Sequence, residues 1–301
     1  MQPNFQGIYP YLVTPMRSDG SVNEQVLSAL VEHLIQSGVH GLTALGSTGE
    51  FAYLNRSQRR TVVQTVARAA HGRVPMIAGV CHAATREAAD QAREYEALGA
   101  AGILAVMDAY FPVDDSQIIA YFKGIAQSVS CPVVLYTNPN FSRVDLSIVA
   151  LEKLCEVPNI LYLKDASGRT GRLLSIMNRL GNRISIFSAS ADVPLFVMMI
   201  GGVGWMAGPA CLIPRQSVRL YDLALQRKWD EAMALQRVLW DVNRVFKRYN
   251  LAACIKAGLR LQGFDVGDPV APLSPLQAEA IEEIRAVLSH VDGAAGKPGT
   301  G

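Results

Sequence analysis

The segment Ile160-Leu161-Tyr162-Leu163-Lys164 is a short apolar run of the kind that forms a buried strand in a parallel sheet. Seven similar runs occur along the chain, and their starts lie about 28 residues apart, which is near the repeat of a (β/α)₈ barrel. We expect the eight strands at residues 8–13, 41–45, 76–80, 102–106, 133–136, 160–164, 184–188 and 203–207. Such a regular series predicts repeated βα units.

The segments between these runs have the period of amphipathic helices, with Asn23 and Thr85 as start signals for two of them. A doubly wound open sheet is the competing arrangement, but eight unbroken units without G-x-G-x-x-G after the first strand favour an α/β TIM barrel. Three further helical stretches follow near residues 229–249, 251–261 and 275–289. We therefore predict a catalytic (β/α)₈ barrel over 1–227, a C-terminal helical extension over 228–291 and a mobile tail over 292–301.

The composition excludes several classes of protein. Hydrophobic residues make up 50% of the 301 residues and charged residues 18%, which is typical of a globular enzyme and not of a disordered chain. The net charge of +2 and the absence of a long basic run argue against nucleic acid as a partner. No apolar stretch is long enough to span a membrane, and the N-terminus lacks a secretory pattern, so we expect a cytoplasmic protein.

Cysteine and histidine spacing gives no sign of a metal site. The five cysteines include no C-x-x-C pair, and the five histidines are scattered. We therefore predict neither disulfides nor zinc, and no cofactor.

A lysine closes the sixth predicted strand. In a barrel, catalytic groups lie where strands end and the following loops begin, and the strand period of two places Lys164 on the same side as Ile160 and Tyr162. Burial lowers the pKa of a lysine and supplies the free amine that a nucleophile needs. Alternatively, Lys164 could extend its amine to solvent or pair with a nearby carboxylate. The residues at the neighbouring strand ends distinguish these interpretations.

Two neighbouring strand ends carry suitable groups. Tyr136 closes the fifth strand and could exchange protons with an adduct on a lysine, although a lone tyrosine there could equally be core. Gly46-Ser47-Thr48-Gly49-Glu50 follows the second strand, and its glycines free the backbone to present N–H groups and two hydroxyls to an anion. This pentapeptide predicts a carboxylate site, although a phosphate site or a simple tight turn would look similar.

In these features the chain resembles the dihydrodipicolinate synthase and N-acetylneuraminate lyase superfamily of class I, lysine-dependent barrels. The resemblance covers nearly the whole chain, including the helical extension. It is carried by four motifs in order, Tyr11-Leu12-Val13-Thr14-Pro15, Gly46-Ser47-Thr48-Gly49-Glu50, Tyr136-Thr137-Asn138-Pro139 and Lys164-Asp165-Ala166-Ser167-Gly168.

The resemblance implies a lyase in which Lys164 forms a Schiff base with pyruvate or another 2-oxo acid and Tyr136 carries protons. It implies that Ser47 and Thr48 bind the carboxylate and help to relay protons, with Gly46 as a further substrate-binding residue. An aldehyde or its adduct would be the second reactant. The resemblance further implies a homo-oligomer, a dimer of dimers. In the synthases the second tyrosine of a pair reaches a neighbouring subunit's site, and here Tyr110 alone remains of that pair.

One departure concerns the second substrate. The synthases carry an arginine two residues after the proline of the third motif, which binds the carboxylate of aspartate semialdehyde. This chain has Phe141 there, with Arg143 two residues further on, and both are candidate substrate-binding residues. Phe51-Ala52-Tyr53-Leu54 and Asn138-Pro139 also resemble the hydroxypyrroline-carboxylate deaminase branch. The alternatives are therefore a deaminase of that type, a true 4-hydroxy-tetrahydrodipicolinate synthase, or a non-catalytic 2-oxo acid sensor.

Two other residues, Met206 and Lys256, have competing interpretations. Met206, at the end of the eighth strand, is a candidate substrate-binding residue beside Trp205, but barrel interiors need large side chains in any case. Lys256, on a predicted helix, is interpreted as structural and is the reserve candidate for the nucleophile. A phosphate-handling isomerase would need a glycine-rich anion site after the last two strands, and none is evident there.

Overall fold

Eight parallel strands close into a barrel in the computed structural model, which describes residues 4–189 and 191–295. The order of neighbours is β1-β8-β7-β6-β5-β4-β3-β2, and a bridge between Tyr11 and Thr43 joins the two ends of the series. The predicted TIM barrel is confirmed. The strands are β1 (Gly7–Pro10), β2 (Leu42–Ala44), β3 (Met76–Cys81), β4 (Gly102–Val106), β5 (Val133–Thr137), β6 (Ile160–Asp165), β7 (Ser185–Ser188) and β8 (Gly204–Ala207).

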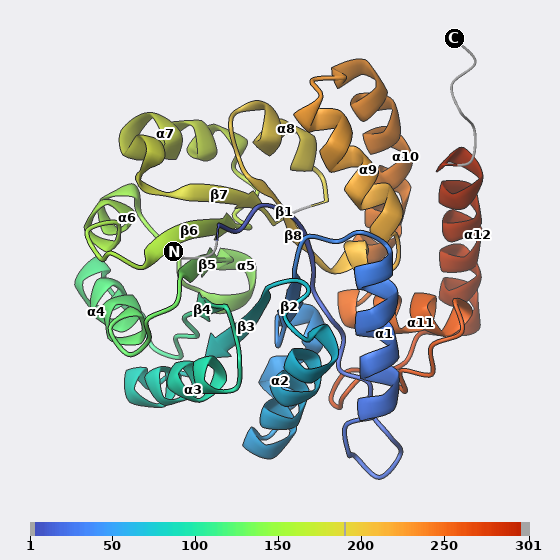
Figure 1. Cartoon of the computed structure of the whole chain (residues 1–301), viewed down its shortest axis with the longest axis horizontal. Helices are drawn as coiled ribbons and strands as arrows, with labels where there is room; N and C mark the ends of the chain where they lie inside the picture. Colours follow the sequence, from blue (N-terminus) through green and yellow to red (C-terminus); the bar gives the residue numbers. More distant parts are fainter. Residues whose placement is uncertain (1–3, 190, 296–301) are drawn as a thin grey trace.

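Helices surround the barrel and alternate with its strands (Figure 1). Those of the barrel are α1 (Glu24–Gln36), α2 (Arg56–Ala70), α3 (Thr85–Ala97), α4 (Asp115–Ala126), α5 (Pro139–Ser142), α6 (Ile148–Leu154), α7 (Thr170–Leu180), α8 (Pro194–Met199) and α9 (Pro214–Leu225). Those of the extension are α10 (Trp229–Arg248), α11 (Leu251–Leu261) and α12 (Ala278–Ala295). Short 3-10 helices lie at Ser47–Gly49, Phe51–Tyr53, Gly181–Arg183 and Gly208–Cys211.

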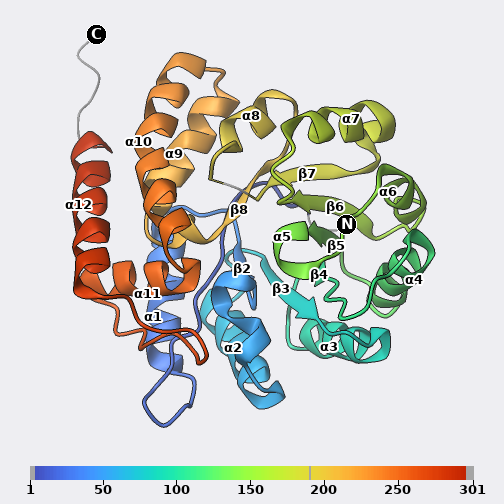
Figure 2. The ribbon, with the colours of Figure 1, turned by 180° about the vertical axis from the view of Figure 1, so that it is seen from behind.

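The three helices of the extension lie together at one side of the barrel, beside α1 and α9 (Figures 1 and 2). Helix α12 continues to Ala295, four residues past the boundary that we expected at residue 291. The rest of the predicted tail, residues 296–301, lies outside the described residues. No helix among those described is long and apolar enough to cross a membrane.

Aromatic side chains fill the barrel interior below the site. Phe5 packs on Tyr162 with ring centroids 5.2 Å apart, and its backbone N–H donates to the Tyr162 hydroxyl at 2.9 Å. Tyr9 meets Phe187 edge to face at 5.5 Å. Since bulky side chains close this end, any cavity must open at the opposite end, where the strands finish.

The pairing of β5 with β6 sets the geometry of the site. Tyr136 and Lys164 are direct partners in the parallel register, so their side chains leave adjacent strands at the same level. The sequence predicted both residues at strand ends, and the register brings them side by side.

Candidate active site

A cavity of about 890 Å³ opens at the carboxyl ends of the strands, within the size range of small-molecule sites. Five of the predicted site residues line it: Lys164, Tyr136, Ser47, Thr48 and Phe141. They come from β6, β5, the turn after β2, and α5, which lies across this end of the barrel (Figure 2). The structure therefore gathers residues that are up to 117 positions apart in the chain.

The Lys164 amine lies between two aromatic rings. Its side chain is only 3% exposed, and Nζ lies 3.8 Å from the ring centroid of Tyr136 and 4.0 Å from that of Tyr11. Burial holds the pKa of Lys164 well below its ordinary value, because a charged ammonium loses its hydration there. The geometry thus favours the neutral amine, which is the nucleophilic form.

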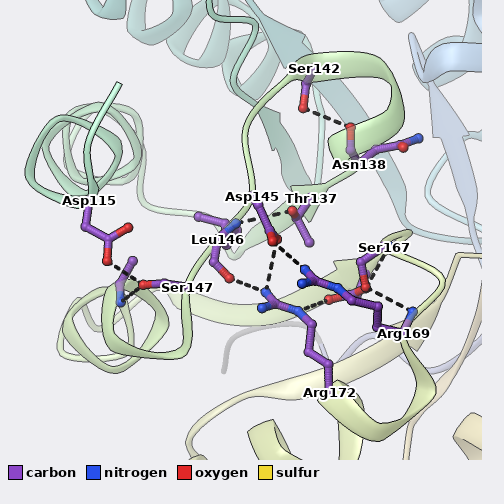
Figure 3. Close-up of polar contacts among 12 residues, drawn as sticks. Asp115, Thr137, Asn138, Ser142, Asp145, Leu146, Ser147, Ser167, Arg169 and Arg172 are labelled. Carbon is purple, nitrogen blue, oxygen red and sulfur yellow. Dashed lines mark hydrogen bonds and ion pairs between the residues drawn. The ribbon is translucent and has the colours of Figure 1, made fainter. Parts of the chain in front are cut away.

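The carboxylate nearest in sequence is kept away from this amine. Asp165 faces the other way and pairs with Arg172, whose Nε lies 2.8 Å from Asp165 Oδ2. Arg172 also donates to the Leu146 carbonyl and approaches Asp145 (Figure 3). No described carboxylate forms an ion pair with Lys164, so nothing of that kind opposes the effect of burial on its pKa.

The Tyr136 hydroxyl is oriented by two side chains. Asn138 Nδ2 donates to it at 2.9 Å, and Ser47 forms a second hydrogen bond with it. Burial raises the pKa of Tyr136, and these two hydrogen bonds oppose that shift. The phenol therefore stays protonated at neutral pH and is placed to carry a proton beside Lys164.

The 3-10 turn Ser47–Gly49 after β2, called the anion turn below, brings Ser47 and Thr48 to the cavity. The first N–H groups of such a turn, here those of Ser47 and Thr48, have no acceptor within the turn itself, an arrangement suited to a carboxylate. Gly46 is needed because a Cβ there would come within 2.3 Å of the Tyr11 ring. The Thr14 hydroxyl fixes the far side of the turn by donating to the Gly49 carbonyl at 2.8 Å.

Residues 4–291 of this sequence match the dihydrodipicolinate synthetase family. The chain belongs to this family. As a member of the dihydrodipicolinate synthetase family, it is a lyase of the aldolase type.

Relatives of the chain agree with this membership. A 4-hydroxy-tetrahydrodipicolinate synthase from Phenylobacterium zucineum is 32% identical over 96% of this chain and 98% of the relative. The dihydrodipicolinate synthase from Aquifex aeolicus has a TM-score of 0.92 at 27% identity, covering 96% of this chain and 98% of that one. A prophage protein of the same family from E. coli K12, solved in complex with pyruvate, has a TM-score of 0.91 at 25% identity, covering 96% and 99% of the two chains.

Four other predicted site residues do not line the cavity of this family member. Met206 is fully buried in the barrel interior, and Gly46 lies behind the anion turn against Tyr11. Arg143 is exposed at the end of α5 with a left-handed backbone, φ 55°. Tyr110 is 80% exposed and packs edge to face on Phe111.

Several residues that line the cavity were not singled out from the sequence. Tyr11 belonged to a quoted motif, yet its ring covers the Lys164 amine and its buried hydroxyl has no hydrogen-bond partner among the described residues. Asn138 orients Tyr136. The helical extension contributes Phe246 and Leu251 to the cavity wall. The quoted motifs gave no signal for Phe246 and Leu251, because these two residues lie far along the chain from all four motifs.

Metal ligands are not grouped in the described part of the chain. No cluster of three or more histidine, cysteine, aspartate or glutamate residues there could hold a metal ion.

Proposed function

We propose that the protein is a Schiff-base lyase in which Lys164 Nζ attacks the ketone carbon of pyruvate or a related 2-oxo acid. Water leaves, and the resulting protonated imine withdraws electrons, so that C3 can lose a proton and become an enamine. The enamine then adds to an aldehyde, and the same steps in reverse release a 2-oxo acid. Tyr136 carries the protons, while Ser47 and Thr48 hold the carboxylate.

One observation carries this proposal: the buried Lys164 amine lies 3.8 Å from the ring of Tyr136, in the cavity that also holds the Ser47–Gly49 turn. Nucleophile, proton carrier and anion site therefore face one space. A non-catalytic sensor would need only the anion site. The test is a panel of 2-oxo acids and aldehydes, including aspartate semialdehyde, aromatic aldehydes and hydroxyproline-derived acids, scored for release or consumption of pyruvate and of 2-oxoglutarate semialdehyde.

The wall of the cavity as a whole is largely apolar. Phe141, 68% exposed, stands at the opening, and Tyr53, Phe246 and Leu251 line the same cavity. Lys247 also lines it, but its amine pairs with Asp192 at 2.5 Å. We therefore propose an aromatic or weakly charged aldehyde as the second reactant.

We expect the protein to be a poor 4-hydroxy-tetrahydrodipicolinate synthase and Phe141→Arg to improve it. A charge-assisted contact from arginine to the semialdehyde carboxylate contributes about 1.5 to 3 kcal/mol, which is about 10 to 150-fold in kcat/KM. Condensation of pyruvate with aspartate semialdehyde measures the effect. Leu225→Arg, which adds the same charge on the exposed surface of α9, is the control. Wild-type kcat/KM at or above about 10⁴ M⁻¹s⁻¹ would contradict the substrate assignment.

Tyr110 and Phe111 form an exposed aromatic pair, 80% and 75% exposed, close to the end of β4. We propose that this pair packs on a second copy in a dimer of dimers and that Tyr110 there reaches the neighbouring site. Sedimentation of the wild type is expected to give a tetramer, and Phe111→Glu is expected to shift it to smaller species. A fully active wild-type monomer contradicts this proposal.

We propose the cytoplasm as the place of action. The five cysteines form no disulfide, as is usual for chains kept in a reducing compartment.

A further inference from the structure

A buried ion pair joins the anion turn to the helical extension. Glu50 Oε2 lies 2.6 Å from Lys256 Nζ, and both side chains are 0% exposed. Burial lowers the pKa of Lys256, and the Glu50 carboxylate opposes that shift. Lys256 does not line the cavity, whereas Glu50 does. The chemistry proposed above gives neither residue a role.

Both partners are fixed by further contacts to one loop after α11. Glu50 Oε1 accepts from the Val270 backbone N–H at 2.7 Å, and Lys256 Nζ donates to the Asp268 carbonyl at 2.8 Å. The loop itself is anchored to the first βα loop, since Met16 N–H donates to the Val266 carbonyl at 3.1 Å. The carboxylate is therefore held from two directions.

Glu50 closes the anion turn in a strained backbone conformation. Its φ of 58° lies in the left-handed region, which is costly for a residue with a side chain, and its N–H donates to the Ser47 carbonyl at 3.1 Å. Such a conformation persists only where surrounding contacts hold it. The contacts to Lys256 and Val270 are suited to that task.

Helix α11 also packs next to Thr48. A Cβ on Gly208 would come within 2.6 Å of Thr48 Oγ1 and 2.5 Å of Ile255 Cδ1, so these three residues are closely packed. Ile255 directly precedes Lys256 on α11. The same turn of this helix thus supports both the Thr48 hydroxyl and the end of the anion turn.

We propose that Glu50 and Lys256 are positioning residues that hold Ser47 and Thr48 in the geometry that binds the 2-oxo acid carboxylate. This inference rests on the proposed function of the same site. A buried ion pair adds little net stability compared with an apolar pair, so the role that suits Glu50 and Lys256 at this turn is the geometry that the pair imposes.

The test compares variants that remove the pairing with as little loss of stability as the site allows. Glu50→Gln keeps the shape and the acceptor for Val270, and Glu50→Gln/Lys256→Met removes both charges together, which avoids an unpaired buried charge. The control is Arg260→Met, because Arg260 also joins α11 to Asp268, at 2.8 Å, without touching Glu50. For each variant, four quantities are measured: the melting temperature, the pyruvate concentration that half-saturates borohydride trapping, KM and kcat.

In both variants we expect the half-saturating pyruvate concentration and the KM for pyruvate to rise about 10 to 100-fold, with a smaller change in kcat. In Arg260→Met we expect all three quantities to keep their wild-type values. The rise is expected even where the melting temperature stays at the wild-type value. If the double variant does not fold, Glu50→Gln alone decides. Unshifted half-saturation in the folded variants overturns the inference, whereas a wild type that forms no adduct overturns the proposed function instead.

Discussion

Lys164→Met is expected to lose catalysis by about 10⁴-fold or more, because the variant has no amine to form the imine on which every later step depends. The methionine side chain fills the space between the rings of Tyr11 and Tyr136. The fold should therefore be retained. Its stability should not fall, because removing the buried amine also removes the cost of desolvating it. Turnover of pyruvate, followed beside the melting temperature, measures both effects.

Borohydride reduction in the presence of pyruvate is expected to add a stable mass to the wild type, on the peptide that contains Lys164. The Lys164→Met variant should gain none. An adduct on Lys256, or turnover within about tenfold of wild type, would falsify the assignment of the nucleophile.

The pH dependence of trapping follows from the lowered pKa of Lys164. The amine takes up its proton only as the pH falls through this lowered pKa, so the reactive form persists further into the neutral range than for an exposed lysine. An exposed lysine with an ordinary pKa loses about 100-fold of its free amine between pH 9 and pH 7. Adduct formation at Lys164 with cyanoborohydride should fall much less over this interval.

The barrel could be predicted because its signal is local and repeated. Each buried parallel strand reads as an apolar run by itself, and eight runs at one spacing leave little choice of fold. The bounds were less certain: β1 ends at Pro10, where we expected residue 13, and α12 continues to Ala295. Strand and helix ends depend on hydrogen bonds and packing that a run of hydrophobicity does not specify.

The candidate site could be predicted where function places an unusual residue at a strand end. Lys164 and Tyr136 stand out for that reason, and the barrel register brings them together. The pairing of Glu50 with Lys256 could not be predicted, because it joins residues 206 positions apart and depends on how the extension packs. The sequence suggests a structural role for Lys256 but not the group that pairs with its charge, and the structure shows that this group is Glu50.

Tyr136→Phe is expected to slow turnover by about 10² to 10⁴, the usual contribution of a positioned proton carrier, while the fold is retained. Phenylalanine keeps the ring that packs against Lys164, so imine formation should be less affected than the later proton transfers. The lost hydroxyl leaves Asn138 Nδ2 without its acceptor, which costs about 1 to 3 kcal/mol of stability.

Tyr162→Phe is the matched control, since it removes a hydroxyl that is also hydrogen-bonded inside the barrel. That hydroxyl accepts from the Phe5 N–H at 2.9 Å, and Tyr162 does not line the cavity. We expect the control to lose stability by a similar amount and to keep its kcat. If the two variants lose kcat equally, the effect of Tyr136→Phe comes from packing. If Tyr136→Phe keeps wild-type kcat, another group must carry the proton, and the Ser47 hydroxyl, which hydrogen-bonds to Tyr136, is a candidate.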